Sequence, residues 1–327
     1  MEHKADEAGA RPAPPQKLPR RRALSVVSFA MLVVLAGAYS LRPGIATAIT
    51  VWPAWVGLLF GVGLTLLMPR PRRWLMLGWV LFGVGFVEEF RTLPRGLFPA
   101  PPADFRVVTL NCAGGSALAA AEVMALRPDV VLFQESPSRP DLERLAREIY
   151  GPNAVVAWGP DTSILACGRL EPFPRPRRIA NYVAARWHAS PERTLDLVSL
   201  RLAPPVLRFD LYNPAAWQDF AESRARRGQE MADMHGHLME QGVQPGILGG
   251  DFNTPVDPPI QEVLVGEMED AFAAAGVGLG ATCVNPAPNI VRIDQIWFGP
   301  SVSCVRAWVV PTRHSDHRMV VADFRWR

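Results

Sequence analysis

Three uncharged apolar segments in the first 90 residues constrain the fold of this 327-residue chain most strongly. They cover residues 23–41, about 45–68 and 74–90, and Glu88-Glu89 closes the apolar part of the third. About 20 apolar residues in a helix span the roughly 30 Å core of a bilayer, whereas the core helices of soluble proteins keep a polar face. We therefore predict three membrane helices within residues 23–90, the third of them short.

Basic residues stand on alternate sides of these segments, and this predicts their orientation. Cytoplasmic loops of membrane proteins carry an excess of lysine and arginine. Residues 1–22 and the loop between the second and third segments are basic, whereas the loop between the first and second holds only Arg42. We expect residues 1–22 to be a disordered cytoplasmic tail. Three crossings of the cell (inner) membrane would then place everything after residue 90 on the extracytoplasmic side.

A change of composition after the apolar region marks the start of a second part of the chain. Residues 91–103 hold Pro94, Pro99, Pro101 and Pro102, which predicts a semi-rigid linker. Residues 104–327 follow, a length that single α/β domains often reach. The chain would thus contact the lipid bilayer through residues 23–90 and carry one catalytic domain behind them.

Short apolar runs and helical patterns alternate in the first third of residues 104–327, and strands dominate later. Strands are predicted near 106–110, 129–133, 154–158, 163–167, 181–188, 194–202, 246–250, 291–298, 303–310 and 318–325. Helices are predicted at 116–126, 141–149 and about 215–241. This order predicts two packed β-sheets flanked by helices, a four-layer α/β sandwich.

Charge and cysteine content exclude some classes of function. The net charge is only +3, so no global electrostatic signature points to nucleic acid, although a local basic patch remains open. The four cysteines have neither CxxC nor Cys/His spacing, which argues against a zinc site. Cys283 and Cys304 are a possible disulfide outside the cytoplasm, and the alternative is that all four are small buried apolar residues.

Five predicted strands or loops end in an acid, an amide or a histidine. These segments are Val107 to Asn111, Val130 to Glu135, Gly250-Asp251-Phe252-Asn253-Thr254-Pro255, Arg292-Ile293-Asp294-Gln295-Ile296 and Ser315-Asp316-His317. Strand ends gather at one rim of such a fold, where loops carry function. Each segment alone has a structural alternative: Asn111 as a turn residue, Glu135 as a solvated loop acid, or Asp316 as an acid paired with a neighbouring arginine.

Together these segments resemble the endonuclease/exonuclease/phosphatase family, the superfamily of DNase-I-like metal-dependent phosphoesterases. The resemblance covers about residues 104–327, and its five matches occur in the family's order. The Gly250 to Pro255 segment and the Ser315-Asp316-His317 segment near the C-terminus are the most specific. With the apolar segments in front, the chain is similar to membrane-anchored bacterial members.

The resemblance implies a divalent metal site, with Mg²⁺ or Mn²⁺ as the cofactor. Glu135 is the implied metal ligand, since Mg²⁺ typically uses one or two carboxylates and keeps several waters. Asp316 would assist it, and Asn111 would lie near the metal or the phosphate. Bound metal stabilises the charge of the transition state of an in-line attack by water.

The resemblance also implies four catalytic residues. Asp251 would orient or deprotonate the attacking water, and Asn253 would donate a hydrogen bond to the phosphate or the water. His317 would contact a non-bridging oxygen as an imidazolium. Asp294 would hold His317 in orientation, like the carboxylate behind a triad histidine.

One position departs from the family pattern. Members often carry Val-x-x-His-Leu in the strand before the long helix, where this chain has Leu197 to Leu202 with Arg201 in place of the histidine. An arginine can bind phosphate with two donors but cannot act as a general acid near neutral pH. Either the metal stabilises the leaving group, or activity is reduced, or the register differs. Arg226 is a second candidate for substrate binding, and the alternative for Arg224, Arg226 and Arg227 is a solvated helix face.

We therefore predict a metal-dependent phosphoester hydrolase that acts outside the cytoplasm. The substrate stays open between nucleic acid and phospholipid, and the sequence indicates no obligate protein partner. The alternatives are a phosphodiesterase or phosphatase for lipid head groups, and a degenerate member that binds phosphate with little turnover. The full set of polar residues argues against degeneracy.

Overall fold

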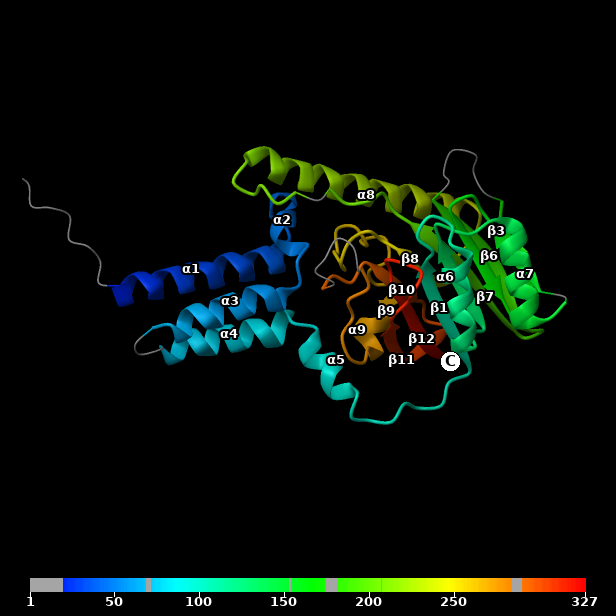
Figure 1. The fold of residues 1–327 in the computed structure, drawn as a ribbon, viewed down its shortest axis with the longest axis horizontal. Coiled ribbons are helices and arrows are strands. Elements are labelled where there is room, and N and C mark those ends of the chain that lie inside the picture. Colours follow the sequence, from blue (N-terminus) through cyan, green and yellow to red (C-terminus); the bar gives the residue numbers. More distant parts are fainter. Residues whose placement is uncertain (1–19, 69–71, 153, 175–180, 207, 284–289) are drawn as a thin grey trace, which may run out of the picture.

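Two six-stranded β-sheets stack face to face, and a group of apolar helices lies to one side of them (Figure 1). This arrangement comes from a computed structural model of the full chain. The structure describes residues 20–68, 72–152, 154–174, 181–206, 208–283 and 290–327. The predicted tail at residues 1–22 thus lies largely outside the described residues.

The first sheet has the strand order β11-β12-β1-β2-β4-β3. β1 and β2 are parallel and the other neighbours are antiparallel. The strands are β1 (Phe105–Asn111), β2 (Val130–Gln134), β3 (Val155–Trp158), β4 (Thr162–Ala166), β11 (Val302–Val310) and β12 (Met319–Trp326).

The second sheet has the order β5-β6-β7-β8-β10-β9. Here β7 and β8 are the parallel pair, so each sheet holds one parallel pair near its middle. The strands are β5 (Arg169–Pro172), β6 (Tyr182–Ser190), β7 (Arg193–Arg201), β8 (Pro245–Asp251), β9 (Glu269–Asp270) and β10 (Asp294–Phe298).

Helices cover the outer face of each sheet. α6 (Ala117–Ala121), the 3-10 helix η2 (Glu122–Leu126) and α7 (Arg139–Tyr150) pack on the first sheet, and α8 (Pro214–Glu240) packs on the second. The short α9 (Ala271–Ala275) lies beside β10 and β11. Buried aliphatic side chains such as Leu132, Leu197 and Ile247 fill the space between the sheets. The predicted four-layer sandwich is confirmed.

The predicted elements agree with the observed ones to within a few residues, with three exceptions. The strands β5 and β9 and the helix α9 are not predicted, because each is short and carries little periodic signal. The helix predicted over 116–126 is divided into α6 and η2. The strand predicted over 291–298 begins only at Asp294.

The described residues from Arg20 to Arg95 fold largely into helices. They are α1 (Arg20–Leu41), the 3-10 helix η1 (Gly44–Ala46), α2 (Thr47–Thr50), α3 (Ala54–Leu66), α4 (Arg73–Phe86) and α5 (Glu89–Arg95). The helices α1, α3 and α4 pack side by side and form what we call the helical bundle (Figure 1). η1 and α2 lie across the end of the bundle and pack against α8.

The prediction of three membrane spans needs correction. Among the described residues, one helix is long and apolar enough to cross a membrane, at Arg22–Leu41. The second apolar segment bends by 73° between Gly44–Thr50 and Ala54–Leu66, and Pro53 caps the helix that follows the bend. The third segment forms a helix of only 14 residues, since the chain turns at Val87 before two glutamates. Apolar composition alone did not reveal these breaks.

The predicted linker at residues 91–103 is partly helical and is fixed to the catalytic domain. In α5, the hydroxyl of Thr92 donates to the carbonyl of Gly278 at 2.7 Å. Arg95 donates to the carbonyl of Ala273 at 3.0 Å. Residues 91–95 therefore belong to a helix that is docked on this domain, and the residues after them connect the helix to β1 (Figure 1).

A buried ion pair joins the bundle to the catalytic domain. Arg224 of α8 binds Asp257 with two hydrogen bonds of 2.6 and 2.8 Å, and both side chains are more than 90% buried. Arg224 also donates to the carbonyl of Arg42, and Arg42 donates to the carbonyl of Val256. Arg224 was expected to lie on a solvated helix face, and this expectation was wrong.

We expect Asp257→Asn to lower the free energy of unfolding by about 3 kcal/mol, because it leaves the buried guanidinium of Arg224 uncompensated. Glu143→Gln is the matched control: its exposed pair with Arg139 is worth roughly 0.5 kcal/mol or less. Chemical unfolding of the full chain in detergent measures both. Equal, small losses in the two variants would contradict the proposed role of this pair.

Candidate active site

Strand register gathers the predicted site residues at one edge of the stacked sheets. Asn111 and Gln134 end β1 and β2 as direct neighbours, so Glu135 leaves the sheet beside Asn111. In the second sheet Asp251 pairs with Arg201 on one side and with Asp294 on the other. Four of the five predicted segments thus meet at this edge. The strands β1, β2 and β8 end there, whereas β10, which is antiparallel to β8, begins there at Asp294.

A glycine allows the two central strands of the second sheet to approach each other. Gly250 has φ +151°, and a Cβ there would lie 1.9 Å from the carbonyl oxygen of Leu200. Only glycine fits this position. The Gly-Asp pair therefore places the carboxylate of Asp251 directly beside the end of β7.

The side-chain amide of Asn111 joins the two sheets. Its Nδ2 donates to Glu135 at 3.1 Å and to Asp251 at 3.0 Å. Its Oδ1 accepts from the backbone N–H of Ala113 at 3.0 Å. Both hydrogens of the amide are used, so the side chain is fixed and holds two carboxylates from different sheets near each other.

Glu135 lies in a strained turn after β2. Its φ is +44°, a left-handed conformation that few non-glycine residues adopt and that is often found at functional sites. Its carboxylate accepts from Asn111, from Arg201 at 2.7 Å and from the backbone N–H of Gly114 at 2.6 Å. Burial alone would raise its pKa, but the hydrogen bonds and Arg201 lower it, so Glu135 is ionised at neutral pH.

Asp251 is fully buried at the base of the site. Burial, together with the nearby charge of Asp294, raises the pKa of Asp251 to about 7. Its Oδ1 accepts from the backbone N–H of Asn253 at 2.8 Å. Asn253 has φ +51° and donates from Nδ2 to the carbonyl of Leu202. One of the two N–H groups of that amide is thus engaged with the backbone.

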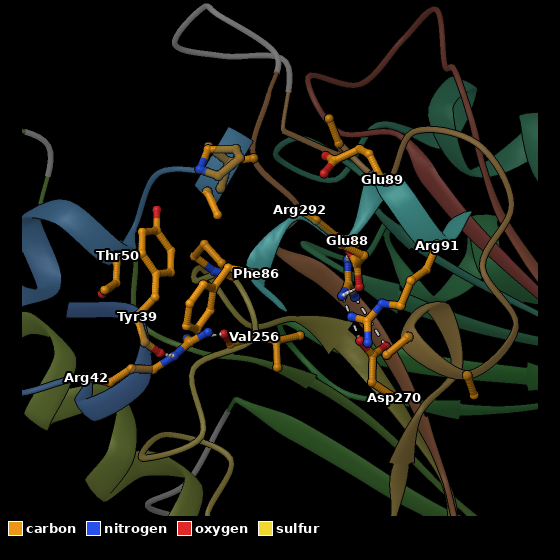
Figure 2. A pocket seen from close by; sticks show the side chains of 18 of the residues that line it. Tyr39, Arg42, Thr50, Phe86, Glu88, Glu89, Arg91, Val256, Asp270 and Arg292 are labelled. Atoms are coloured by element: carbon orange, nitrogen blue, oxygen red, sulfur yellow. Dashed lines mark hydrogen bonds and ion pairs between the residues drawn. The ribbon is translucent and has the colours of Figure 1, made fainter. Parts of the chain in front are cut away.

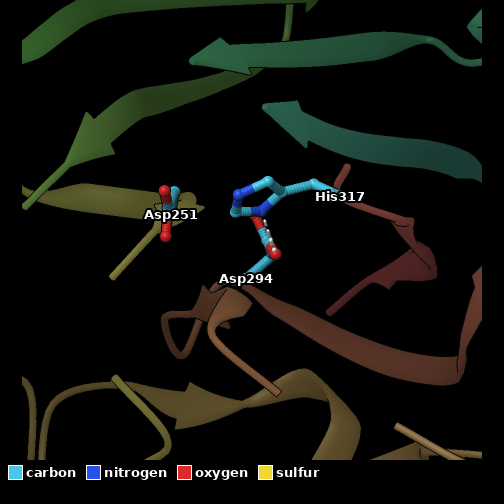
Figure 3. Close-up of side chains that lie close together, drawn as sticks. All are labelled: Asp251, Asp294 and His317. Atoms are coloured by element: carbon cyan, nitrogen blue, oxygen red, sulfur yellow. Dashed lines mark hydrogen bonds and ion pairs between the residues drawn. The ribbon is translucent and has the colours of Figure 1, made fainter. Parts of the chain in front are cut away.

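His317 and Asp294 form a buried pair next to Asp251, as Figure 3 shows. Nδ1 of His317 lies 2.9 Å from Asp294. Burial alone would lower the pKa of His317, but the charge and hydrogen bond of Asp294 raise it to about 10. His317 is therefore an imidazolium at neutral pH. The loop that carries His317 is held against β1, because the hydroxyl of Ser315 donates to the carbonyl of Asn111 at 2.7 Å.

Arg201 lies inside the site, at the end of β7. Its guanidinium is 2.7 Å from Glu135, 3.4 Å from Asp161 and 4.0 Å from Asp251. The Nε atom is buried and lacks a hydrogen-bond partner among the described residues. An oxygen of a bound phosphate would satisfy this N–H.

Two predicted residues lie apart from this group. Asp316 is exposed, although its charge contributes to raising the pKa of His317. Arg226 is exposed on α8 and forms an ion pair with Glu230 at 3.3 Å. The structure therefore does not bring Arg226 to the site.

Asp161 was missed by the sequence reading. It stands in the turn between β3 and β4, within reach of Arg201, and its carbonyl accepts from the N–H of Ser136. Burial raises its pKa, and the charge of Arg201 opposes that rise. The only sequence signal is the Gly159-Pro160-Asp161 turn, which is too common to indicate a function.

The charges of the site fit a divalent cation. Four carboxylates lie there, those of Glu135, Asp161, Asp251 and Asp294, against the two cations Arg201 and His317. When all four acids are ionised, two negative charges are in excess. Oxygen ligands of this kind are what Mg²⁺ and Mn²⁺ prefer.

Glu135 fits such a cation better than the buried Asp251, Asp294 and His317 group does. In that group the side-chain donor atoms lie within 4.8 Å of one another, but His317 is protonated and already paired with Asp294. A protonated imidazole cannot ligate a metal. Glu135 is ionised and, among the described residues, has no such histidine partner. It lines, together with Asp251 and His317, a pocket of about 290 Å³, which we call the catalytic pocket.

The family model for the endonuclease/exonuclease/phosphatase family matches residues 108–317. The chain belongs to this family. The match begins in β1 and ends at His317, so it includes every residue of the site described above. No curated protein matches the chain significantly.

Solved structures of the endonuclease/exonuclease/phosphatase family share the fold. A family protein from Bacteroides thetaiotaomicron is 14% identical, with a TM-score of 0.51 over 68% of this chain and 98% of the other. One from Bacteroides vulgatus is 15% identical, with a TM-score of 0.51 over 69% and 100%. A mannosyl-6-phosphatase from Bacteroides thetaiotaomicron is 14% identical, with a TM-score of 0.50 over 68% and 100%. In each case roughly a third of this chain lies outside the match.

We expect the metal-free protein to keep His317 protonated from pH 6 to 8, because its raised pKa means that the proton leaves only as the pH approaches about 10. Asp294→Asn should lower this pKa toward the ordinary imidazole value of about 6.5, since burial is then opposed only by the smaller effects of Asp251 and Asp316. Asp316→Asn should have a much smaller effect. NMR titration of the imidazole signals, assigned with His317→Gln, measures this. A wild-type ring that titrates near pH 6.5 would contradict the account.

Proposed function

We propose that this protein is a membrane-anchored phosphoester hydrolase that requires Mg²⁺ or Mn²⁺ and acts outside the cytoplasm. Its family membership supports a phosphoester as the substrate. The observation that carries the proposal is the joining of Glu135, Asn111 and Asp251 at one rim, with an imidazolium and a guanidinium facing the same pocket. A degenerate binding module would not need this complete set.

In the proposed reaction a water attacks phosphorus in line with the leaving oxygen. Asp251 orients this water and accepts its proton, a role for which a pKa of about 7 is well matched. The second N–H of the Asn253 amide donates to the water or to the phosphate. Glu135 is the principal metal ligand, with Asn111 beside it and Asp316 reaching in at most through water. When bound, the cation stabilises charge on the phosphoryl oxygens and acidifies a water or leaving group.

His317 and Arg201 bind the negative charge that gathers on the phosphoryl oxygens. His317 donates from Nε2 to a non-bridging oxygen, while Asp294 holds Nδ1 and so fixes the ring. Arg201 offers its unpartnered Nε–H to a second oxygen. Because Arg201 keeps its proton at neutral pH, it stabilises charge but does not protonate the leaving group. Arg226 is no longer proposed as a substrate ligand.

The surface and interior of the helical bundle support membrane anchoring. Large apolar side chains are exposed on all three helices, among them Val26, Phe60 and Leu81 at 62–69% exposure. Polar groups instead face inward: the hydroxyls of Ser28 and Thr65 share a hydrogen bond of 2.8 Å. Apolar surface outside and hydrogen bonds between helices inside are typical of membrane bundles.

Close packing within the bundle follows the same pattern. A Cβ at Gly61 would lie 2.1 Å from the ring of Trp79, and small residues at such contacts are typical of membrane helices. We propose that α1 spans the membrane and that the shorter α3 and α4 pack beside it. Three arginines, Arg20, Arg21 and Arg22, form the first turn of α1, and this positive charge favours a cytoplasmic N-terminus.

Purified full-length protein should hydrolyse at least one member of a panel of DNA, RNA, phospholipid and sugar phosphate esters with Mg²⁺ or Mn²⁺. Glu135→Gln and Asp251→Asn should each lower kcat/KM by about 10³-fold, and chelator should abolish turnover reversibly. Glu240→Gln, at an exposed acid far from the site, should match the wild type. Full activity in excess chelator would rule out the proposed mechanism.

A reporter enzyme that is active only outside the cytoplasm, fused after Arg327, should be active, because the proposed anchor places the catalytic domain there. Washing of membranes with alkaline carbonate should leave the fusion in the membrane fraction, since an apolar span is not released by charge neutralisation. Activity of a cytoplasm-only reporter at the same position would show that the proposed orientation is wrong.

A further inference from the structure

The catalytic pocket is built partly from the apolar N-terminal region. Its floor holds Glu135, Arg201, Asp251, Asn253 and His317. Apolar side chains line its walls: Val51, Trp52, Pro204, Pro205, Phe209 and Phe220. Val51 and Trp52 come from the turn between α2 and α3, more than 50 residues before the catalytic domain begins.

Several contacts fix this turn over the pocket. The hydroxyl of Tyr39 donates to the carbonyl of Trp52 at 2.6 Å. Just before η1, Arg42 donates to Val256 at 2.6 Å, and Arg224 donates to the carbonyl of Arg42 at 2.8 Å. η1 and α2 then pack on α8. The position of Trp52 is therefore set by the fold of both parts and is not a chance approach of a loose loop.

A second cavity, of about 630 Å³, lies between the end of the bundle and the catalytic domain. Tyr39 and Phe86 line it near the bundle, and the ion pairs of Arg292 with Glu88 and Asp270 lie on its far side, as Figure 2 shows. Trp52, Pro255 and Val291 line both this cavity and the catalytic pocket. These side chains therefore form a wall that the catalytic pocket shares with the cavity beside the bundle.

The charges of the pocket do not suit a long polyanion. A nucleic acid backbone needs a series of available cations, and its bases need aromatic surfaces for stacking. The two arginines that line the pocket are both engaged: Arg201 with Glu135 and Asp161, and Arg208 with Asp210 and Asp219. Nε of Arg201 has no hydrogen-bond partner among the described residues, and His317 lines the same pocket, a set that fits one phosphate group better than a chain of them.

The walls suit an apolar group next to that phosphate. Phe209 lines the pocket and is 71% exposed, and Tyr212 nearby in the chain is 91% exposed. Large aromatic side chains that stay exposed near a concave site mark a surface for an apolar partner. The turn that carries Trp52 is at the end of the bundle that faces the catalytic domain (Figure 1), where aromatic residues lie at the boundary between bilayer and water.

We propose that the substrate is an amphiphilic phosphoester, a lipid of the bilayer that holds the bundle. Its phosphate lies on the polar floor of the catalytic pocket, and its hydrocarbon part packs against Trp52, Val51 and Phe209. The substrate enters from the membrane side, beside the bundle. This inference rests on the proposed hydrolase function, and the experiment below separates failure of one from failure of the other.

The experiment compares matched pairs of substrates with the full chain in detergent micelles and Mg²⁺. Each pair is a dihexanoyl glycerophospholipid and the same molecule without its acyl chains, with choline, ethanolamine or glycerol as the head group. The ratio of the two kcat/KM values measures selectivity for the acylated substrate. For at least one head group, the wild type should prefer the acylated member by about tenfold or more, because several buried methylene groups contribute to binding.

Trp52→Ala should reduce this ratio by about tenfold, mainly through KM of the acylated substrate. The bond from Tyr39 is to the backbone of Trp52 and survives the substitution. Trp74→Ala is the matched control. Trp74 is the second residue of α4, at the end of the bundle away from the catalytic domain, and is 48% exposed. It should leave the ratio unchanged, and it corrects for partition of lipid into the micelle.

A binding measurement decides the inference even without turnover. Asp251→Asn protein, with and without Trp52→Ala, is titrated calorimetrically with the same lipid pairs. Tighter binding of the acylated member that is lost with Trp52→Ala supports the inference, even if the wild type hydrolyses nothing and the proposed hydrolase function fails. A ratio near one in the wild type, or equal losses on both members in Trp52→Ala, would overturn it.

Discussion

The rest of the site depends on the amide of Asn111. Its two hydrogens bind Glu135 from the first sheet and Asp251 from the second. Arg201 with Glu135, and Ser199 with Gln134, also join the sheets, but among the described residues the Asn111 amide alone donates a hydrogen bond to both acids. An aspartate at this position would place a third carboxylate beside the other two, whereas an alanine would remove the donor that they share. The amide therefore positions the two acids on which a phosphoester hydrolase of this kind depends.

Most of the catalytic domain followed from its sequence, because local pattern and tertiary structure agree there. Each acid or amide follows a buried strand, and parallel neighbours end together, so Asn111, Glu135 and Asp251 could be grouped before any coordinates. The register that places Arg201 beside Asp251 also follows from counting along β7. Asp161 could not be found in this way, since a turn brings it to the site and turns carry no register.

The N-terminal region was harder, because composition predicts environment but not where a helix bends. An apolar run of about 24 residues reads as one span, although Pro53 divides it and turns Trp52 toward the catalytic domain. Ion pairs between residues far apart in the chain could not be predicted from the sequence for a similar reason. Arg224 looked solvated on its own helix, yet its partner Asp257 lies 33 residues later. Neither the bend at Pro53 nor the pair of Arg224 with Asp257 produces a periodic pattern in the sequence.

Arg201 gives this site a built-in cation where relatives are expected to carry an imidazole. It lies within 4.0 Å of three carboxylates and so offsets part of their repulsion, but two negative charges remain in excess when all four acids of the site are ionised. The central claim is that a divalent cation at Glu135 balances them. Crystals of the protein with Mn²⁺, measured at the manganese absorption edge, test this directly. The account predicts one anomalous peak in contact with Glu135. A peak at Asp294 and His317 alone, or none at millimolar Mn²⁺, would contradict it.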